Sequence, residues 1–197
     1  MVPGSFPRFR SQVGRVGFED EARSISNYES LFIPGLLQTE DYARALLHGT
    51  WPHAPADEVE KRVTARLQRQ TLLDREDPPR LWAIADEAAV RRRVGGRQIM
   101  RAQLDRLRDA AAQPNVTLQV IPFDAGSHPG MDGSFIVLDF PDPEDPSIVY
   151  TESAAGGLFL EEEMEIRRYI LIFDHLRAAA LRPEATVSLL ADIAAEA

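Results

Sequence analysis

The chain has 197 residues, which is enough for one domain with a substantial core and too few for two of ordinary size. Hydrophobic residues make up 44% and charged residues 27%, a composition that excludes disorder through most of the length. With 31 acidic against 22 basic residues, the net charge of -9 disfavours direct binding to the phosphate backbone of nucleic acid. We therefore expect one folded unit that does not bind DNA or RNA by itself.

The residue types exclude several kinds of chemistry. There is no cysteine, so disulfides, thiolate metal sites and cysteine nucleophiles are absent. No segment approaches the roughly 18 apolar residues of a membrane span, and the N-terminus lacks the apolar core of a signal peptide. These features predict a cytoplasmic protein with no membrane contact.

In chain order, residues 1–17 are rich in Gly, Pro, Arg and Ser, and we interpret them as an N-terminal arm or linker remnant. Residues 18–197 are predicted to form a single α+β effector-type domain. It begins with a short extended segment, in which Ile25 and Asn27 face away from Ser24, Ser26 and Tyr28.

A Pro34-Gly35 turn then leads into a helix with clear signals at both ends. Thr39 is a good N-cap, and Gly49 is placed to end the helix. The apolar face of this helix is formed by Tyr42, Ala43, Leu46 and Leu47. Capping and packing leave Gln38 unexplained, because it is a polar residue between two leucines and the cap.

The next helix is predicted within residues 55–75. Asp57 and Glu60 have the spacing of a capping box, and the face opposite its apolar stripe is charged, which places it at the surface. A strand at 81–85, a short helical turn ending at Gly95-Gly96 and an amphipathic helix at 97–112 follow.

Three strands are predicted at residues 115–123, 133–140 and 147–153, since each is rich in β-branched or aromatic residues. Two helices follow, the first at about 161–181 and the second from Pro183. The first would turn six side chains toward the core: Met164, Ile166, Tyr169, Ile170, Phe173 and Leu176. The fold class is therefore α+β, with a mostly antiparallel sheet of about four to five strands packed with amphipathic helices and covered on one face.

The loop "DAGSHPGMDG" places His128 between Asp124 and Asp132. No second histidine lies nearby and the spacing matches no metal motif, so we predict no metal; an ordered connection is favoured, with a ligand-contacting loop as the alternative. The chain also lacks a G-x-G-x-x-G loop, a P-loop lysine and a G-x-S-x-G elbow. No cofactor is predicted.

Charged residues at strand ends allow two interpretations. Asp86 and Glu87 either cap a short helix or border a pocket. Glu152 likewise ends a strand. The arginines at 91–93 are expected to form a solvated surface, and His175, beside core residues, a structural hydrogen bond.

If a small-molecule pocket exists, we expect polar and aromatic residues at turns and strand ends to line it. The predicted ligand-binding residues are Tyr28, Gln38, Tyr42, Glu87, His128, Phe135 and Glu152.

Several long blocks carry a family resemblance, among them "YESLFIPGLLQTEDYARALL", "LWAIADEAAVRRRVGG", "PNVTLQVIPFDAGSHPGMDGSFIVLDFPD" and "IVYTES". From about Phe6 to the C-terminus the chain resembles the actinobacterial domain of unknown function 5753. In WhiJ-like, antitoxin-like transcriptional regulators this domain follows a helix-turn-helix, which residues 1–17 are too short to hold. The resemblance implies an effector- or partner-sensing module that controls DNA binding elsewhere in a polypeptide, with a small acidic protein as one partner.

Three hypotheses follow. The first is a ligand- or partner-sensing regulatory domain without catalysis. The second is a free-standing, cofactor-independent enzyme of natural-product biosynthesis, cyclase-like and acting on an apolar or polyketide-like small molecule by orientation in an apolar pocket. The third is a homodimerisation module built on the apolar helices within residues 161–196.

Overall fold

The computed structural model describes residues 15–153 and 156–196. Its elements in chain order are α1 (Arg15–Glu21), β1 (Ser24–Glu29), η2 (Gly35–Leu37), α2 (Glu40–Thr50), α3 (Ala56–Gln70), η3 (Thr71–Asp74), β2 (Arg80–Asp86), α4 (Glu87–Arg91), α5 (Arg97–Ala111), β3 (Val116–Ile121), η4 (Phe123–Ala125), η5 (Pro129–Asp132), β4 (Phe135–Asp139), β5 (Ile148–Ser153), β6 (Gly156–Leu160), α6 (Glu163–Ala179) and α7 (Pro183–Glu196). The α+β class is confirmed.

One sheet organises the molecule, with strand order β3-β2-β1-β4-β5-β6. On one side of β1 the strands β2 and β3 run parallel to it, and on the other side β4 pairs with it antiparallel. The sheet is therefore mixed and has six strands, whereas the sequence predicted four to five in a mostly antiparallel arrangement. Long helical connections from β1 to β2 and from β2 to β3 allow the parallel pairs, because a parallel neighbour needs a crossover.

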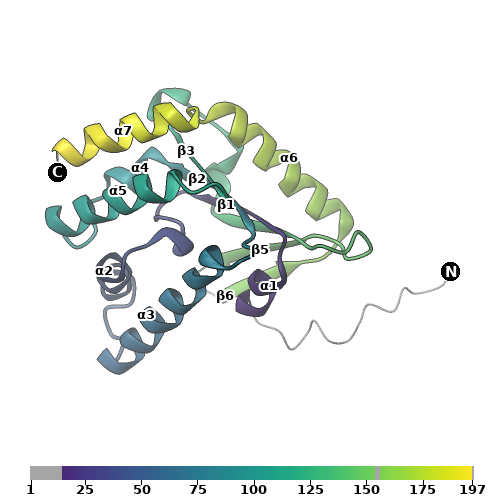
Figure 1. The fold of residues 1–197 in the computed structure, drawn as a ribbon, viewed down its shortest axis with the longest axis horizontal. Coiled ribbons are helices and arrows are strands. Elements are labelled where there is room, and N and C mark those ends of the chain that lie inside the picture. Colours follow the sequence, from purple (N-terminus) through teal and green to yellow (C-terminus); the bar gives the residue numbers. More distant parts are fainter. Residues whose placement is uncertain (1–14, 154–155, 197) are drawn as a thin grey trace.

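Helices cover both faces of the sheet, not one as predicted (Figure 1). One face carries the main core, to which Tyr42 of α2, Leu104 of α5 and Leu190 of α7 belong. The other face packs against α6 through Ile166, Phe173 and Leu176, in a separate cluster. The crossovers from β1 to β2 and from β2 to β3 both run on the main-core face, where α2 and α5 pack, and α6 packs on the other face.

The alternation of side chains predicted for the residues of β1 is confirmed. Ile25 belongs to the main core and Tyr28 to the α6 side, as their alternation predicted. In register, Tyr28 lies opposite Ile84 of β2 and Phe135 of β4. The residues that follow Tyr28, beginning with Glu29, emerge at the end of the sheet where β4 begins and β5 ends.

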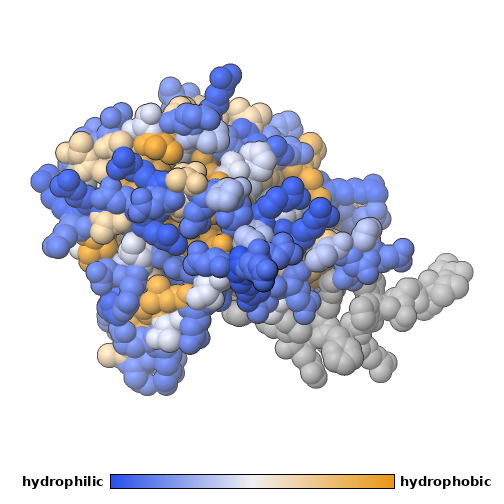
Figure 2. Space-filling view, in the orientation of Figure 1, coloured by the Kyte–Doolittle hydropathy of each residue, from blue (hydrophilic) through white to orange (hydrophobic). Residues whose placement is uncertain are grey.

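The α2–α3 hairpin projects from the body at the lower left of Figure 2, with an apolar patch among hydrophilic residues. Arg44 of α2 joins the two helices through two bonds to Glu60, at 2.7 and 3.0 Å. This pairing lowers the pKa of the Glu60 carboxyl. A small cluster of Leu47, Val59 and Val63 packs between the helices. The hairpin is thus a local unit attached to the sheet by its inner side.

Several element ends differ from the sequence predictions. Thr39 is the N-cap of α2, as expected, and its hydroxyl accepts from the Tyr42 amide. The helix does not end at Gly49 but continues to Thr50, whose hydroxyl donates to the Leu46 carbonyl. The last carbonyl groups of a helix have no backbone partner within the helix, and this side-chain bond supplies one for the carbonyl of Leu46.

The capping box predicted at the start of the second helix is wrong. Pro55 occupies the N-cap position of α3 and makes no side-chain cap bond. Asp57 bonds instead to Lys61, one helical turn away, and Glu60 to Arg44. The backbone carbonyl of Pro55 accepts from the amides of Glu58 and Val59, so the helix starts on backbone hydrogen bonds alone.

One α-helix and one strand were not predicted. The helix α1 begins at Arg15, within the segment interpreted as an arm, and buries Phe18 against Phe159 with ring centroids 5.1 Å apart. Its partner strand β6, with sequence GGLFL, lacks the alternation of a typical strand and begins with two glycines. Each element is stabilised by contact with the other, which local sequence does not reveal.

The helix α6 is less buried than predicted. Ile166, Phe173 and Leu176 are in the core, but Met164 is 84% exposed and Ile170 39% exposed. His175 is also exposed, so the structural hydrogen bond expected in the core is not its role. A helix that packs on one side of a sheet buries only a stripe of its surface. In the described part of the chain, no helix is long and apolar enough to cross a membrane.

The outer edge of β3 is closed by Leu181, between α6 and α7, and by Thr186 in the first turn of α7. The Val120 amide donates to the Thr186 hydroxyl at 3.1 Å, and the Leu181 amide donates to the Val120 carbonyl at 2.9 Å. Thr186 is fully buried. Its hydroxyl therefore satisfies an edge amide that no strand reaches.

Replacing Thr186 by valine keeps the side-chain shape and removes this acceptor. We expect the free energy of unfolding to fall by about 1–3 kcal/mol, because the Val120 amide would be buried without a partner. Urea denaturation followed by circular dichroism measures this change. The control Thr186→Ser keeps the hydroxyl, and it should lose less stability than the valine variant; the reverse order would contradict the role assigned to this bond.

Candidate functional site

A cleft of about 620 Å³ lies between the α2–α3 hairpin and the ends of β1, β4 and β5. The turn after β1 forms its floor. The described residues that line it are Glu29, Ser30, Leu31, Phe32, Ile33, Gly35, Gln38, Leu46, Leu47, Thr50, Trp51, Arg62, Arg66, Arg69, Gly133, Ser134, Phe135, Ile136, Tyr150, Glu152 and Ser153.

Part of this lining is apolar. Leu46 and Leu47 come from α2, and Ile33 and Ile136 from the floor and from β4. Leu31, two residues after the end of β1, is 49% exposed. Exposure of a large apolar side chain at the mouth of a cleft gives an apolar ligand a surface to cover.

Three arginines of α3 line the same cleft. Arg62, Arg66 and Arg69 are spaced by four and three residues, which puts them on one face of the helix. The guanidinium carbon of Arg62 lies 4.3 Å from the centroid of the Trp51 ring. Stacking on the ring uses the flat face of the guanidinium and leaves its N–H groups directed outward in the plane.

Arg69 has a structural role. It makes a bidentate ion pair with Glu19 of α1, through two bonds of 2.8 Å. Glu19 is 1% exposed, so its charge is buried and depends on such partners. This pair attaches α1 to α3 at one end of the cleft.

Gln38 connects the floor of the cleft to α3. Its amide nitrogen donates to the Ile33 carbonyl at 2.7 Å, and its amide oxygen accepts from Arg66 at 2.6 Å. The backbone carbonyl of Gln38 accepts from the Gln70 side chain at 2.8 Å. Both ends of the buried amide are therefore used, and one of them orients an arginine in the cleft.

A second glutamine supports the same turn from α5. The side chain of Gln103 accepts from the Thr39 amide at 2.7 Å and donates to the Leu37 carbonyl at 2.8 Å. Gln103 is fully buried. The turn between β1 and α2 is thus fixed by side chains from two helices, which gives the cleft a rigid floor.

The sheet side contributes carboxylates. Glu29 ends β1 and accepts a bond of 3.4 Å from the Asn27 side chain. Glu152 lies near the end of β5 and is exposed. The lining therefore has arginines on its helical side and glutamates on its sheet side.

Among the seven residues predicted to bind a ligand, the structure brings Gln38, Phe135 and Glu152 to the cleft. Tyr42 lies elsewhere, fully buried, and its hydroxyl accepts from the Ile33 amide at 3.2 Å. Burial is the main cause that raises the pKa of Tyr42, and this hydrogen bond opposes it. Tyr42 supports the floor from below and does not line the cleft.

Of the two alternatives for Asp86 and Glu87, capping describes Asp86, whereas the Glu87 carboxylate bonds groups other than the helix-end amides of α4. Asp86 accepts from the Ala88 amide at 2.8 Å as the N-cap of α4. Glu87 is buried, where it accepts from Arg91 at 2.6 Å and from the Phe123 amide at 2.8 Å. Arg91 also pairs with Glu196, and Arg92 and Arg93 are exposed, so this run is a surface feature.

Tyr28 and His128 come together on the opposite face of the sheet from the cleft. Their ring centroids are 6.1 Å apart, and His128 Nε2 lies 3.3 Å from a carboxylate oxygen of Asp86. Burial, and then the charges of Asp86 and Glu29, raise the pKa of the Tyr28 phenol. Among the described residues, the Tyr28 hydroxyl and His128 Nδ1 have no hydrogen-bond partner.

The loop sequence around His128 is explained by close packing. A Cβ atom on Gly130 would lie 2.5 Å from a ring carbon of Tyr28, so only glycine fits there. In the part of the chain that the structure describes, no three histidine or carboxylate side chains are placed to hold a metal ion. The loop therefore closes over the core on the α6 side.

The family model described as Domain of unknown function (DUF5753) matches residues 15–192. The chain belongs to the DUF5753 family. The resemblance to this domain that the sequence blocks indicated is thereby confirmed, and the link to WhiJ-like regulators stays a prediction. Searches of curated proteins and of solved structures gave no significant match.

Sequence reasoning missed the arginines of this DUF5753 cleft. The segment "RVTARLQR" shows their spacing, but we interpreted that face of the helix as solvated surface. Trp51 gave a further signal, because a large aromatic residue just after a helix, followed by an arginine row, suits a stacked pair. Recognising the site required knowing that α3 folds back against the ends of β1, β4 and β5.

The two outer arginines should differ in their effect on stability. Arg69→Met removes the bidentate partner of a buried carboxylate, and we expect a loss of about 3–5 kcal/mol in the free energy of unfolding. Arg62→Met affects an exposed side chain and should cost less than about 1 kcal/mol. Urea titration of both variants tests this, and equal losses would show that the Glu19 pair has no special structural role.

The buried tyrosines make a second matched pair. Tyr42→Phe leaves the buried Ile33 amide without its acceptor and should destabilise the domain by about 1–3 kcal/mol. Tyr28→Phe removes a hydroxyl that has no described partner, so stability should stay within about 1 kcal/mol of the wild type or rise. Thermal unfolding measures both. A larger loss for Tyr28→Phe than for Tyr42→Phe would mean that the Tyr28 hydroxyl has a partner that matters.

Proposed function

We propose that this DUF5753 chain is a ligand-sensing regulatory domain that binds a small molecule in the cleft. The observation that carries the proposal is the cleft itself. Its volume of about 620 Å³ falls within the range of small-molecule sites. It combines apolar side chains with a few oriented polar groups, the usual composition of such sites.

The arrangement of the two sides of the cleft supports a role in sensing a ligand. Its two sides belong to different parts of the fold, the α2–α3 hairpin and the strand ends. A ligand that contacts both sides would favour the arrangement in which they are close, and would stabilise that state in proportion to its concentration.

A route from the cleft toward the N-terminal side of the domain supports the regulatory part of the proposal. Arg69 lines the cleft and is bonded to Glu19 of α1. In regulators of the type that the sequence resembles, the DNA-binding part precedes this domain. A ligand that changes the position of α3 would therefore act on α1, which is the element nearest to that part along the chain.

The proposal can be tested by searching for a bound molecule and then replacing an apolar residue of the cleft. In the search, the wild-type chain is incubated with a fractionated actinobacterial metabolite extract, and bound molecules are identified by native mass spectrometry. We expect at least one fraction to bind and to raise the melting temperature by several degrees, since saturation at 100 times Kd adds about 2.7 kcal/mol. The variant Leu31→Asp should reduce this binding by about tenfold or more.

Leu171→Asp is the matched control, because Leu171 is a similarly exposed leucine, 59% exposed, on α6 at the other face. It should bind as the wild type does. Equal loss in both variants, or no bound molecule in any fraction, would contradict the proposal. The enzyme hypothesis stays a separate prediction: it requires that the recovered molecule differ in mass or structure from the one supplied.

A further inference from the structure

The polar groups of the cleft are segregated by sign, and this segregation restricts the ligand. On the helical side the charged lining residues are arginines of α3; on the sheet side they are Glu29 and Glu152. Leu46, Leu47 and Ile33 line the cleft as well and are apolar. A complementary ligand must match this order of charges and apolar surface.

The helical side presents two arginines for recognition. Arg69 is bonded to a buried carboxylate and serves the fold. The Arg62 guanidinium lies over the Trp51 ring, and one N–H group of Arg66 donates to Gln38. Both are restrained before a ligand arrives, and an arginine held in this way loses less side-chain freedom on binding.

Arginine matches a planar oxyanion. Its N–H groups form a flat fork that can donate two parallel bonds to a carboxylate, and such charge-assisted bonds are stronger than bonds to a neutral amide. Arg62 and Arg66 are one helical turn apart, so a single carboxylate could lie within reach of both.

The sheet side has the opposite preference. The carboxylates of Glu29 and Glu152 make a second anion less favourable on this side than a hydrogen-bond donor, because like charges in a partly enclosed cleft repel one another. Oxygen atoms of the two glutamates, together with Ser134, would instead accept hydrogen bonds from hydroxyl or amino groups.

We propose that the ligand is an amphiphilic monoacid. One carboxylate or equivalent planar oxyanion binds Arg62 and Arg66, an apolar body covers the leucines, and donors rather than a second anion face Glu29 and Glu152. This inference rests on the proposed function, because it names the chemical class that the same cleft would take.

Four small aromatic probes with one ring system test it: 2-naphthoate, 6-hydroxy-2-naphthoate, 2-naphthamide and naphthalene-2,6-dicarboxylate. Binding is measured by isothermal titration calorimetry at two salt concentrations. We expect 2-naphthoate to bind about tenfold tighter than its amide, because the acid accepts charge-assisted bonds. The hydroxy acid should bind at least as well as 2-naphthoate, and the dicarboxylate should bind more weakly. Phenyl and decyl acids, each with its amide, repeat the comparison for other body shapes.

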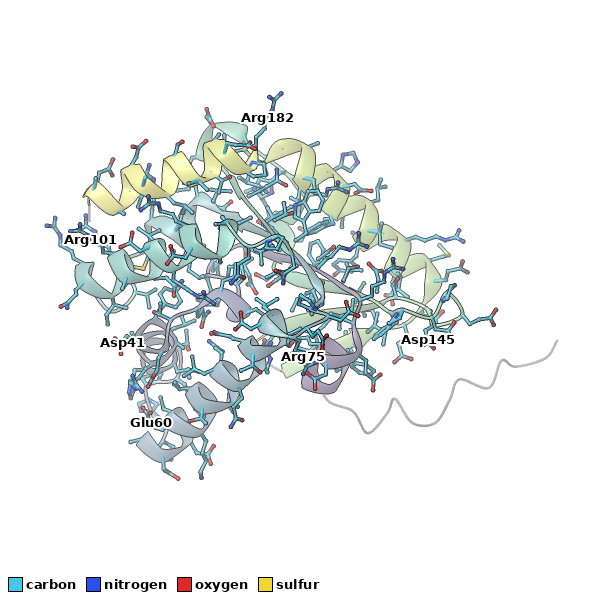
Figure 3. All side chains as sticks on the ribbon, viewed as in Figure 1. Asp41, Glu60, Arg75, Arg101, Asp145 and Arg182 are labelled. Carbon is cyan, nitrogen blue, oxygen red and sulfur yellow. The ribbon has the colours of Figure 1, made fainter. Side chains whose placement is uncertain are left out.

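Variants assign the preference to the arginines. Arg62→Gln should reduce affinity for 2-naphthoate about fivefold or more and leave the amide unchanged, and Arg66→Lys, which keeps the charge but not the fork, should act in the same direction. The control is Arg101→Gln, since Arg101 is an exposed arginine on α5 at the far left of the molecule (Figure 3). It should bind every probe as the wild type does.

The outcomes separate this inference from the proposed function. If every acid binds no tighter than its amide, or if the dicarboxylate binds tightest, the inference is wrong, while a molecule recovered from extract and lost in Leu31→Asp would still support the cleft as a binding site. If no acid binds and no molecule is recovered from extract, both fail. A preference for acids that persists in Arg62→Gln and Arg66→Lys would overturn the assignment to these arginines.

Discussion

The geometry of the cleft depends on one buried amide, that of Gln38. Its nitrogen donates to the Ile33 carbonyl within the turn after β1, and its oxygen accepts from Arg66 of α3. A polar group of this kind is tolerated in the interior only when its hydrogen bonds are made, since an unsatisfied one costs about 1–3 kcal/mol. This requirement sets the distance between turn and helix in the structure without a ligand, and with it the opening between α3 and the sheet. Without that constraint, α3 would be an ordinary surface helix.

The place of the cleft follows from the change of direction in the sheet. Around β1 the strands on one side are parallel and those on the other antiparallel. Parallel neighbours require helical crossovers, which brings α2 and α3 over one face. In the antiparallel half β4 and β5 are joined by a short connection without a helix, and the outer strand β6 packs against α1 through Phe159 and Phe18. A crevice outside the carboxyl end of a central strand, where strand order reverses, is a common location for ligands in open sheets.

Much of the local structure could be predicted from the sequence, and the spatial arrangement could not. The Thr39 cap and the alternation of Ile25 and Tyr28 are local signals, and both are found in the structure. The helix α1 and the strand β6 were missed because each is stabilised by the other through Phe18 and Phe159. For the site, Gln38 was recognised as a polar residue with no local explanation. The arginines were missed because a charged helix face looks the same whether it meets solvent or the end of a sheet.

Binding of a small acid beside α3 would be reported by the two tryptophans of the chain. Trp51 lines the cleft under Arg62, whereas Trp82 lies on the opposite face of the sheet, under Arg177. Their two indole N–H signals can be followed by ¹⁵N–¹H NMR during titration with 6-hydroxy-2-naphthoate. We expect a saturable shift of the Trp51 signal and a constant Trp82 signal. A shift of Trp82 with Trp51 unchanged would contradict it, as would a titration to millimolar probe in which neither signal moves.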